Sequence, residues 1–156
     1  MSEVERIADQ LRRAYEGPAW HGPALREILA GVTAEQAARR PISGAHTIWE
    51  LVLHIAAWES IARRRLSGEV ITDVPDEQDW PPVRDTSEAA WKKALDDLER
   101  GHQQLRQAVA ALTDARLGQK APGKQQDWSI YATVHGVVQH NLYHAGQIAL
   151  LKKAFP

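Results

Sequence analysis

Residues 139–147 read Gln-His-Asn-Leu-Tyr-His-Ala-Gly-Gln and contain two histidines, His140 and His144, four positions apart. On an α-helix such residues lie about 40° apart around the axis and roughly one turn apart along it, so both imidazoles can reach one metal ion. The pair continues a stripe with steps of three and four, as on a core-facing helix side: Val137, Ile148 and Leu151. The stretch therefore predicts a helix that carries half of a divalent-metal site.

A second interpretation of this pair needs no metal. A lone histidine on an apolar face is usually a core residue satisfied by one hydrogen bond, and His140 and His144 could each be one. Burying two imidazoles side by side costs more than burying one. The choice between a metal site and two core histidines therefore depends on whether another part of the chain supplies a third ligand.

The segment from His46 to Leu66 supplies such a candidate. It contains no proline or glycine and predicts a second long helix, whose apolar stripe includes His54 next to Leu51 and Trp58. Three neutral imidazoles around one ion leave coordination positions open, which is typical of catalytic rather than structural sites. We therefore predict a metal centre formed by His54, His140 and His144.

The remaining histidines are predicted to lie outside this centre. His135 is about 140° and 180° around the helix from the pair, so it cannot share their ion. His46 lies close to a helix cap, and His21 lies beside a Gly-Pro break. His102 follows Glu99 at a Glu-x-x-His step, but di-iron bundles need two such motifs. We expect His102 to be a surface or edge residue.

Three polar residues near the predicted ligands are candidates for hydrogen bonds that orient the imidazoles: Glu50, Glu59 and Gln147. Each could equally be a solvated residue or part of a helix-stabilising pair. The spacing of the sequence identifies no general base.

Capping signals and periodicity predict an all-α fold. The expected helices cover about 2–16, 21–29, 33–39, 46–66, 85–112, 113–117 and 129–153, the second being either separate or a kinked continuation of the first. Residues 67–85 hold three prolines and many acids, and predict a long loop that lets the helices on either side run parallel. Trp80 in this loop either covers one end of the core, which we favour, or lines a site entrance. Residues 118–127 are polar and contain a Pro-Gly turn.

The composition excludes several classes of protein. A length of 156 residues predicts one domain, and 19 basic against 20 acidic residues argue against a nucleic-acid partner. The chain has no cysteine, so any thiol chemistry needs an external thiol. No apolar run approaches the roughly 20 residues that span a bilayer, and the N-terminus lacks a signal-peptide pattern. We expect a soluble cytoplasmic protein without a membrane partner.

Two segments resemble the motifs of a known family. Residues 48–59, IWELVLHIAAWE, and 135–153, HGVVQHNLYHAGQIALLKK, are similar to the metal-binding helices of the DinB/YfiT-like metalloenzymes of the DinB superfamily. The resemblance implies that residues 1–156 form one four-helix bundle in up-down-down-up order, with a long crossover from the second to the third helix. It also implies a metal near one end of the core, with zinc or nickel the usual occupant.

Family members with assigned activities are mostly thiol-dependent S-transferases or isomerases that use glutathione, bacillithiol or mycothiol. The resemblance thus implies a metal-dependent enzyme that transfers a low-molecular-weight thiol to a small-molecule electrophile. The alternatives are a metal-dependent hydrolase and a non-catalytic metal-binding protein of the stress response. We expect a homodimer, because the chain has six tryptophans and many apolar residues and because members of the family often dimerise.

Overall fold

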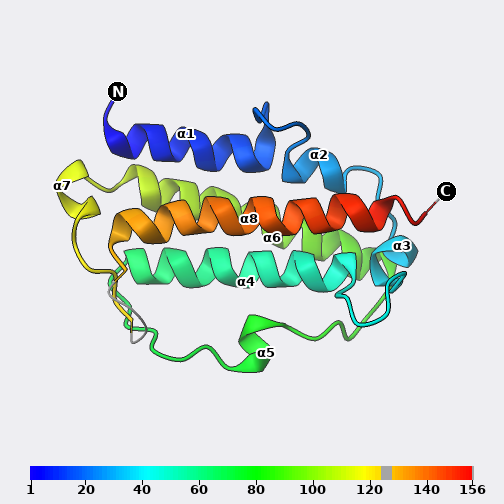
Figure 1. The fold of residues 1–156 in the computed structure, drawn as a ribbon. Helices are drawn as coiled ribbons and strands as arrows, with labels where there is room; N and C mark the ends of the chain where they lie inside the picture. Colours follow the sequence, from blue (N-terminus) through cyan, green and yellow to red (C-terminus); the bar gives the residue numbers. More distant parts are fainter. Residues whose placement is uncertain (124–127, 156) are drawn as a thin grey trace.

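The computed structural model describes residues 1–123 and 128–155, and these form an all-α fold, as expected (Figure 1). The four long helices are α1 (Glu3–Glu16), α4 (Ile48–Leu66), α6 (Glu88–Ala110) and α8 (Ile130–Lys152). The four short helices are α2 (Leu25–Leu29), α3 (Ala34–Ala38), α5 (Asp76–Asp79) and α7 (Asp114–Leu117).

The long helices lie side by side in two directions. In Figure 1, α1 and α8 run from left to right, whereas α4 and α6 run from right to left. Helix α4 packs against α6 and α8, and α1 packs against the same two helices. The segment 67–87, which carries α5, returns the chain to the end at which α4 began, so α4 and α6 run parallel.

The helix starts lie where the capping residues place them. The side chains of Ser2 and Thr33 accept hydrogen bonds from the backbone of the third helical residue, and both form complete capping boxes. Thr47, Ser87 and Ser129 accept equivalent bonds at the starts of α4, α6 and α8. These bonds satisfy backbone N–H groups that would otherwise have no partner in the first turn.

Two connections differ from expectation. The expected helix at 21–29 is neither a kinked continuation of α1 nor nine residues long, because α2 begins only at Leu25, after a turn with a bridge between Ala19 and Gly22. The expected loop at 67–85 contains the short helix α5. Of the expected polar segment 118–127, residues 124–127 lie outside the described residues.

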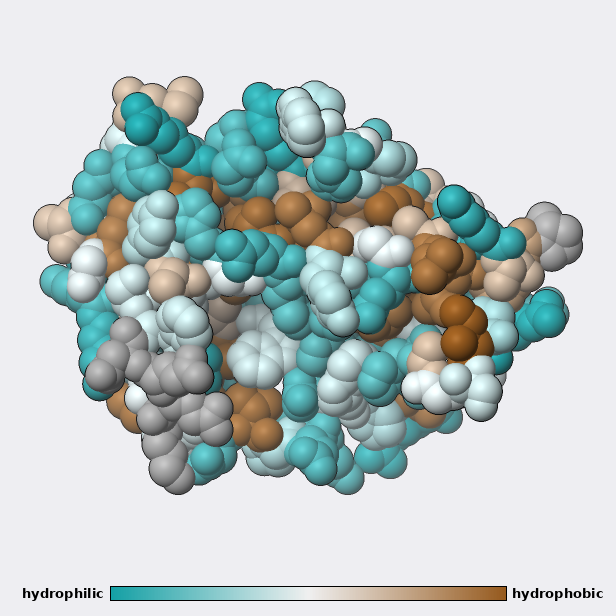
Figure 2. Space-filling model, viewed as in Figure 1, coloured by the Kyte–Doolittle hydropathy of each residue, from teal (hydrophilic) through white to brown (hydrophobic). Residues whose placement is uncertain are grey.

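The apolar core has two clusters along the length of the helices. One contains the first half of α4 and the last part of α8, and the other contains the end of α4 and the start of α8. Figure 2 shows a mostly hydrophilic face with hydrophobic patches, one of them near the C-terminal end of α8. Within the described part of the chain, no helix is both long and apolar enough to span a bilayer.

Candidate metal centre

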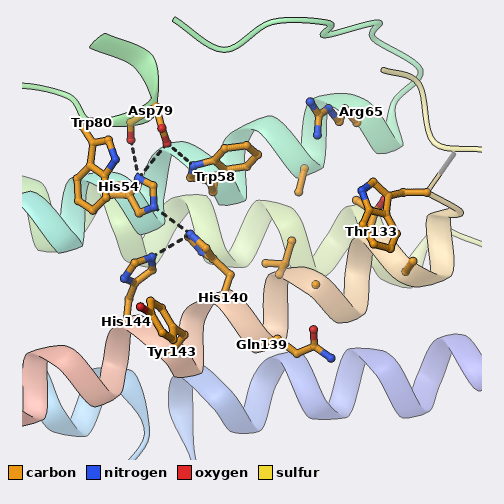
Figure 3. Close-up of a pocket in the computed structure, with 15 residues that line it drawn as sticks. His54, Trp58, Arg65, Asp79, Trp80, Thr133, Gln139, His140, Tyr143 and His144 are labelled. Atoms are coloured by element: carbon orange, nitrogen blue, oxygen red, sulfur yellow. Dashed lines mark hydrogen bonds and ion pairs between the residues drawn. The ribbon is translucent and has the colours of Figure 1, made fainter. Parts of the chain in front are cut away.

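The three predicted ligands meet between α4 and α8 (Figure 3). His54 comes from the middle of α4, and His140 and His144 come from successive turns of α8. Nε2 of His140 lies 3.0 Å from Nε2 of His54 and 3.1 Å from Nε2 of His144. The centre lies between the two core clusters, not near one end of the core as the resemblance implied.

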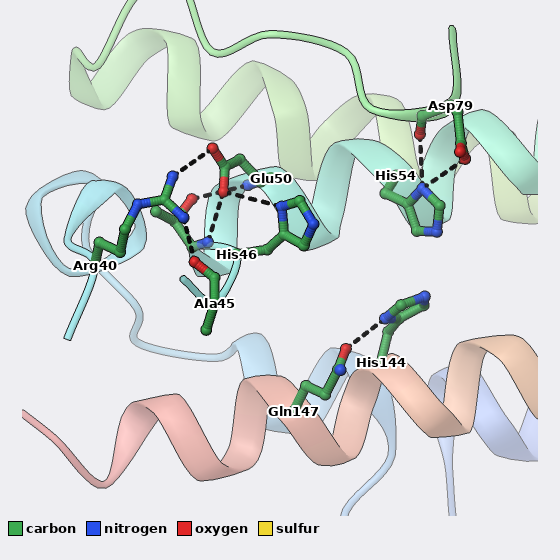
Figure 4. Close-up of polar contacts among 9 residues, drawn as sticks. Arg40, Ala45, His46, Glu50, His54, Asp79, His144 and Gln147 are labelled. Atoms are coloured by element: carbon green, nitrogen blue, oxygen red, sulfur yellow. Dashed lines mark hydrogen bonds and ion pairs between the residues drawn. The ribbon is translucent and has the colours of Figure 1, made fainter. Parts of the chain in front are cut away.

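Two of the imidazoles are oriented through their other ring nitrogen (Figure 4). Nδ1 of His54 donates to the backbone oxygen of Asp79 at 2.6 Å, and Nδ1 of His144 donates to Oε1 of Gln147 at 2.6 Å. A neutral imidazole that donates through Nδ1 presents a lone pair at Nε2, which is the form that binds metals. The hydrogen bonds therefore prepare both residues as ligands.

Burial keeps the cluster uncharged. It is the main cause that lowers the pKa of His140 from 6.5 to about 4, with the neighbouring His144 and His54 as further causes. Burial likewise lowers the pKa of His54 and that of His144. Burial therefore favours neutral rings at this site near pH 7.

The donor set suits a divalent transition metal. Bare Nε2 lone pairs that face one another at 3.0 and 3.1 Å repel unless a proton or a cation lies between them. Imidazole nitrogens lie about 2.0–2.1 Å from zinc, which places two ligands on one ion about 3 Å or slightly more apart. All three ligand atoms lie within 4.8 Å of one another, so the cluster could hold a metal ion.

A cavity of about 670 Å³ opens onto the histidines. It lies between α4 and α8 and is lined mainly by aromatic and small apolar side chains. A volume in this range accommodates a small organic molecule. An ion held by the three histidines would therefore face a space large enough for a substrate.

The segment with α5 forms one wall of this cavity. The ring of Trp80 stacks on that of His54 with centroids 3.8 Å apart, and on that of His46 at 3.5 Å. Trp58 donates from Nε1 to Oδ1 of Asp79 at 2.7 Å, which fixes the residue that orients His54. Trp80 packs against the core as well, but it lines the site, the role that we did not favour.

The three expected orienting residues have different outcomes. Gln147 orients His144, as the sequence suggested. Glu50 instead caps α4 and pairs with Arg40 and His46, away from the triad (Figure 4). Glu59 is fully buried and has no hydrogen bond to any of the three histidines.

The expectation for His102 is wrong, because this residue is fully buried rather than at a surface or edge. Nδ1 of His102 donates to Oε1 of Glu59 at 2.9 Å, and Nδ2 of Asn141 donates to the same oxygen at 2.6 Å. The ring of Tyr15 stacks on His102 with centroids 4.1 Å apart. We call Glu59, His102 and Asn141 the buried polar cluster, a feature that the sequence analysis did not identify.

The other histidines lie outside the triad, as predicted. His135 packs against Tyr131, with ring centroids 4.4 Å apart, and His46 precedes the cap of α4. His21 is exposed in the turn between α1 and α2. Within the described residues, the metal-competent cluster contains His54, His140 and His144 alone.

Comparisons with known proteins agree with the helical architecture. A crystal structure of a conserved protein from Enterococcus faecalis is similar, with a TM-score of 0.72 and 17% identity over 99% of this chain and 97% of that one. At this identity the likeness concerns the fold alone. No curated protein matches the chain. The model of the DinB superfamily matches residues 9–148, which include all three clustered histidines, and the chain belongs to that superfamily.

Proposed function

We propose that the protein is a divalent-metal-dependent enzyme that transfers a low-molecular-weight thiol to a small-molecule electrophile. The observation that carries the proposal is the convergence of three Nε2 atoms on the wall of a cavity of about 670 Å³. A purely structural site would be closed by a fourth protein ligand. Here the described residues offer three, and the cavity supplies access for a fourth ligand from outside.

In this proposal His54, His140 and His144 hold the ion, with zinc or nickel as the expected metal. Such an ion would supply Lewis-acid chemistry that lowers the pKa of a coordinated thiol. The protein's own residues orient the ligands: Asp79 holds His54 and Gln147 holds His144. Trp80 covers one face of His54 and limits its contact with water.

The thiol must come from outside the chain, because none of the 156 residues is a cysteine. Low-molecular-weight thiols are kept reduced in the cytosol, so the proposal includes a cytoplasmic location. Membership of the DinB superfamily supports the metal site, whereas the choice of a thiol as co-substrate rests on the resemblance to characterised members.

Metal analysis and turnover together test this proposal. The protein is loaded with zinc or nickel, its metal content is measured, and transfer to an activated aryl halide is followed with glutathione, bacillithiol and mycothiol. We expect one equivalent of metal, thiol-dependent turnover, and loss of both in His140→Ala. His135→Ala, a histidine on the same helix outside the cluster, should retain both.

Absence of turnover with every thiol in the metal-loaded protein would contradict the proposal. Ester or amide hydrolysis without thiol would identify a hydrolase in its place. Metal binding without either activity would indicate a non-catalytic metal-binding protein.

We propose further that residues 1–156 form one four-helix bundle in up-down-down-up order, with 67–87 as its crossover, and that two copies associate. Tyr143 and Leu150 are seven residues apart on α8 and are 66% and 61% exposed, so one side of this helix offers apolar surface to a second copy. Light scattering should give the mass of a dimer, and Leu150→Glu should give that of a monomer. A monomeric wild type would contradict the dimer.

A further inference from the structure

The cavity extends from the histidines along α4 to an arginine. The residues of α4 that line it recur at steps of four, four and three: His54, Trp58, Ala62 and Arg65. Eleven residues correspond to about three helical turns, so His54 and Arg65 share one side of α4 about 16 Å apart along the axis. Figure 3 shows Arg65 beyond Trp58, at the opposite end of the site from the triad.

Arg65 is held in place, but no described carboxylate neutralises it. Its Nη2 donates to the backbone oxygen of Ile71 at 3.1 Å, and its guanidinium carbon lies 6.0 Å from the centroid of the Trp58 ring. Nε is buried without a hydrogen-bond partner, and no carboxylate of the described residues forms an ion pair with Arg65. Burial lowers the pKa of Arg65, as expected for a cation with no anion nearby among the described residues.

The neighbouring Arg64 differs from Arg65 because it is paired with a carboxylate. Arg64 forms two hydrogen bonds with the carboxylate of Glu69 on the surface, and this pairing raises its pKa. Arg65 turns instead toward the cavity, where the described lining residues include no other lysine or arginine. The one carboxylate among them, Asp79, already accepts a hydrogen bond from Trp58 beside the triad. A partly buried cation without a counter-ion among the described residues is costly, and a ligand anion would recover that cost.

We propose that Arg65 binds a carboxylate of the ligand whose other end reaches the histidine triad. The inference rests on the proposed function, because it takes the triad as the place where the ligand's thiol is held. It defines the ligand class: an elongated anion, about 10–15 Å between thiol and carboxylate, given the helical rise between His54 and Arg65. Trp58 and Val137 line the space between the two ends, so the middle of the ligand contacts apolar surface.

Calorimetric titration with matched probes tests the carboxylate site. The probes are mercaptoundecanoate and mercaptoundecanol, which differ in the terminal carboxylate, and decanoate and decanol, which lack the thiol. We expect Arg65→Gln to weaken binding of both carboxylates by about 10- to 100-fold, the range of a charge-assisted hydrogen bond, and to leave both alcohols within about twofold. Arg64→Gln is the matched control and should bind every probe like the wild type.

Equal loss of carboxylates and alcohols in Arg65→Gln, or equal effects of the two arginine variants, would overturn the proposal. Arg65→Lys retains the charge and provides a second test in case the glutamine variant does not fold. It should still prefer carboxylates to alcohols, and loss of that preference in a folded Arg65→Lys protein would also count against a charge-based site.

Measurements with and without zinc separate this proposal from the proposed function. If decanoate binding depends on Arg65 but zinc does not strengthen binding of either mercaptan, the carboxylate site stands and the thiol function fails. If zinc strengthens mercaptan binding but Arg65→Gln has no effect, the function stands and the carboxylate site fails. Competition identifies which molecule carries the carboxylate. If decanoate binds at the same time as mercaptoundecanol, the carboxylate belongs to the acceptor. If binding of mercaptoundecanoate requires both zinc and Arg65, the carboxylate belongs to the thiol.

Discussion

The metal-free protein should lose stability on acidification because His140 resists protonation in the folded state. Burial and the adjacent His144 and His54 lower the pKa of His140 from 6.5 to about 4. Between these values the unfolded chain binds the proton and the folded protein does not, so the free energy of unfolding falls as the pH falls. The contribution is complete above pH 6.5 and is lost by about pH 4.

The size of the effect follows from the shift. A lowering of about 2.5 pH units, at about 1.4 kcal/mol for each unit, corresponds to about 3 kcal/mol across the whole window. About 2.5 kcal/mol of it should be lost between pH 7 and pH 4.5. The pKa of His54 and that of His144 are also lowered, which adds loss of the same sign.

Urea unfolding in the presence of a chelator, followed by circular dichroism from about pH 7 to about pH 4.5, measures this effect. Carboxylates titrate in the same range, so the relevant quantity is the difference in the free energy of unfolding between the wild type and His140→Gln. That difference should shrink by about 2.5 kcal/mol over the range. His135→Gln should follow the wild type. A difference between wild type and His140→Gln that is independent of pH would refute the reasoning.

Three further predictions concern single substitutions. Alanine at His54, His140 or His144 should lower metal affinity by at least about 100-fold in competition with a chelating dye, and alanine at His135 should not. Glu59→Ala should cost about 3–5 kcal/mol in urea unfolding, because it leaves a cavity and two buried donors without their acceptor; a cost below about 1 kcal/mol would contradict the geometry. Gly17→Ala should cost about 1–3 kcal/mol, since Gly17 has φ of 87° and an added Cβ would lie 3.1 Å from Oε2 of Glu27. Gly31 has φ of 76°, and an added Cβ there would meet no atom within 4 Å apart from its chain neighbours, so Gly31→Ala should cost less in the same assay.

The sequence predicted the long helices and the triad for the same physical reason. A helix fixes the angle between residues a few positions apart, so one stripe places His140 beside His144 and turns His135 away. Capping residues such as Ser2 and Thr33 mark helix starts through bonds that span three residues. Such local rules do not depend on the rest of the fold, and they hold in the structure.

Contacts between distant segments could not be predicted in this way. The orienting bond from His54 goes to Asp79, 25 residues later, and the stack of Trp80 on His54 depends on the path of the whole crossover segment. No periodicity links a loop residue to a helix face. For the same reason the sequence alone favours a covering role for Trp80, whereas the residue lines the site.

The buried polar cluster has a signal in the sequence. Glu59 continues a buried stripe of α4 at steps of four and three: Ile48, Val52, Ile55, Ala62 and Leu66. Asn141 and His102 occupy equivalent positions among the buried residues of α8 and α6. Three polar residues at apolar positions on three helices each need a partner, and they satisfy one another. The spacing suggests Glu99 on the same helix as the neighbour of His102, whereas its partner lies 43 residues away in the sequence.

The buried polar cluster also bears on the geometry of the triad. Helices α4 and α8 carry all three histidines, so their relative register sets the distances between the Nε2 atoms. A slip of one residue along α8 would move His140 and His144 by about 1.5 Å, half of the 3.0 Å between His140 and His54. One oxygen of Glu59 on α4 accepts from Asn141 on α8 and from His102 on α6, and Asn141 is the next residue after His140. Apolar contacts tolerate small slides because they have no direction, whereas these two hydrogen bonds permit a single register.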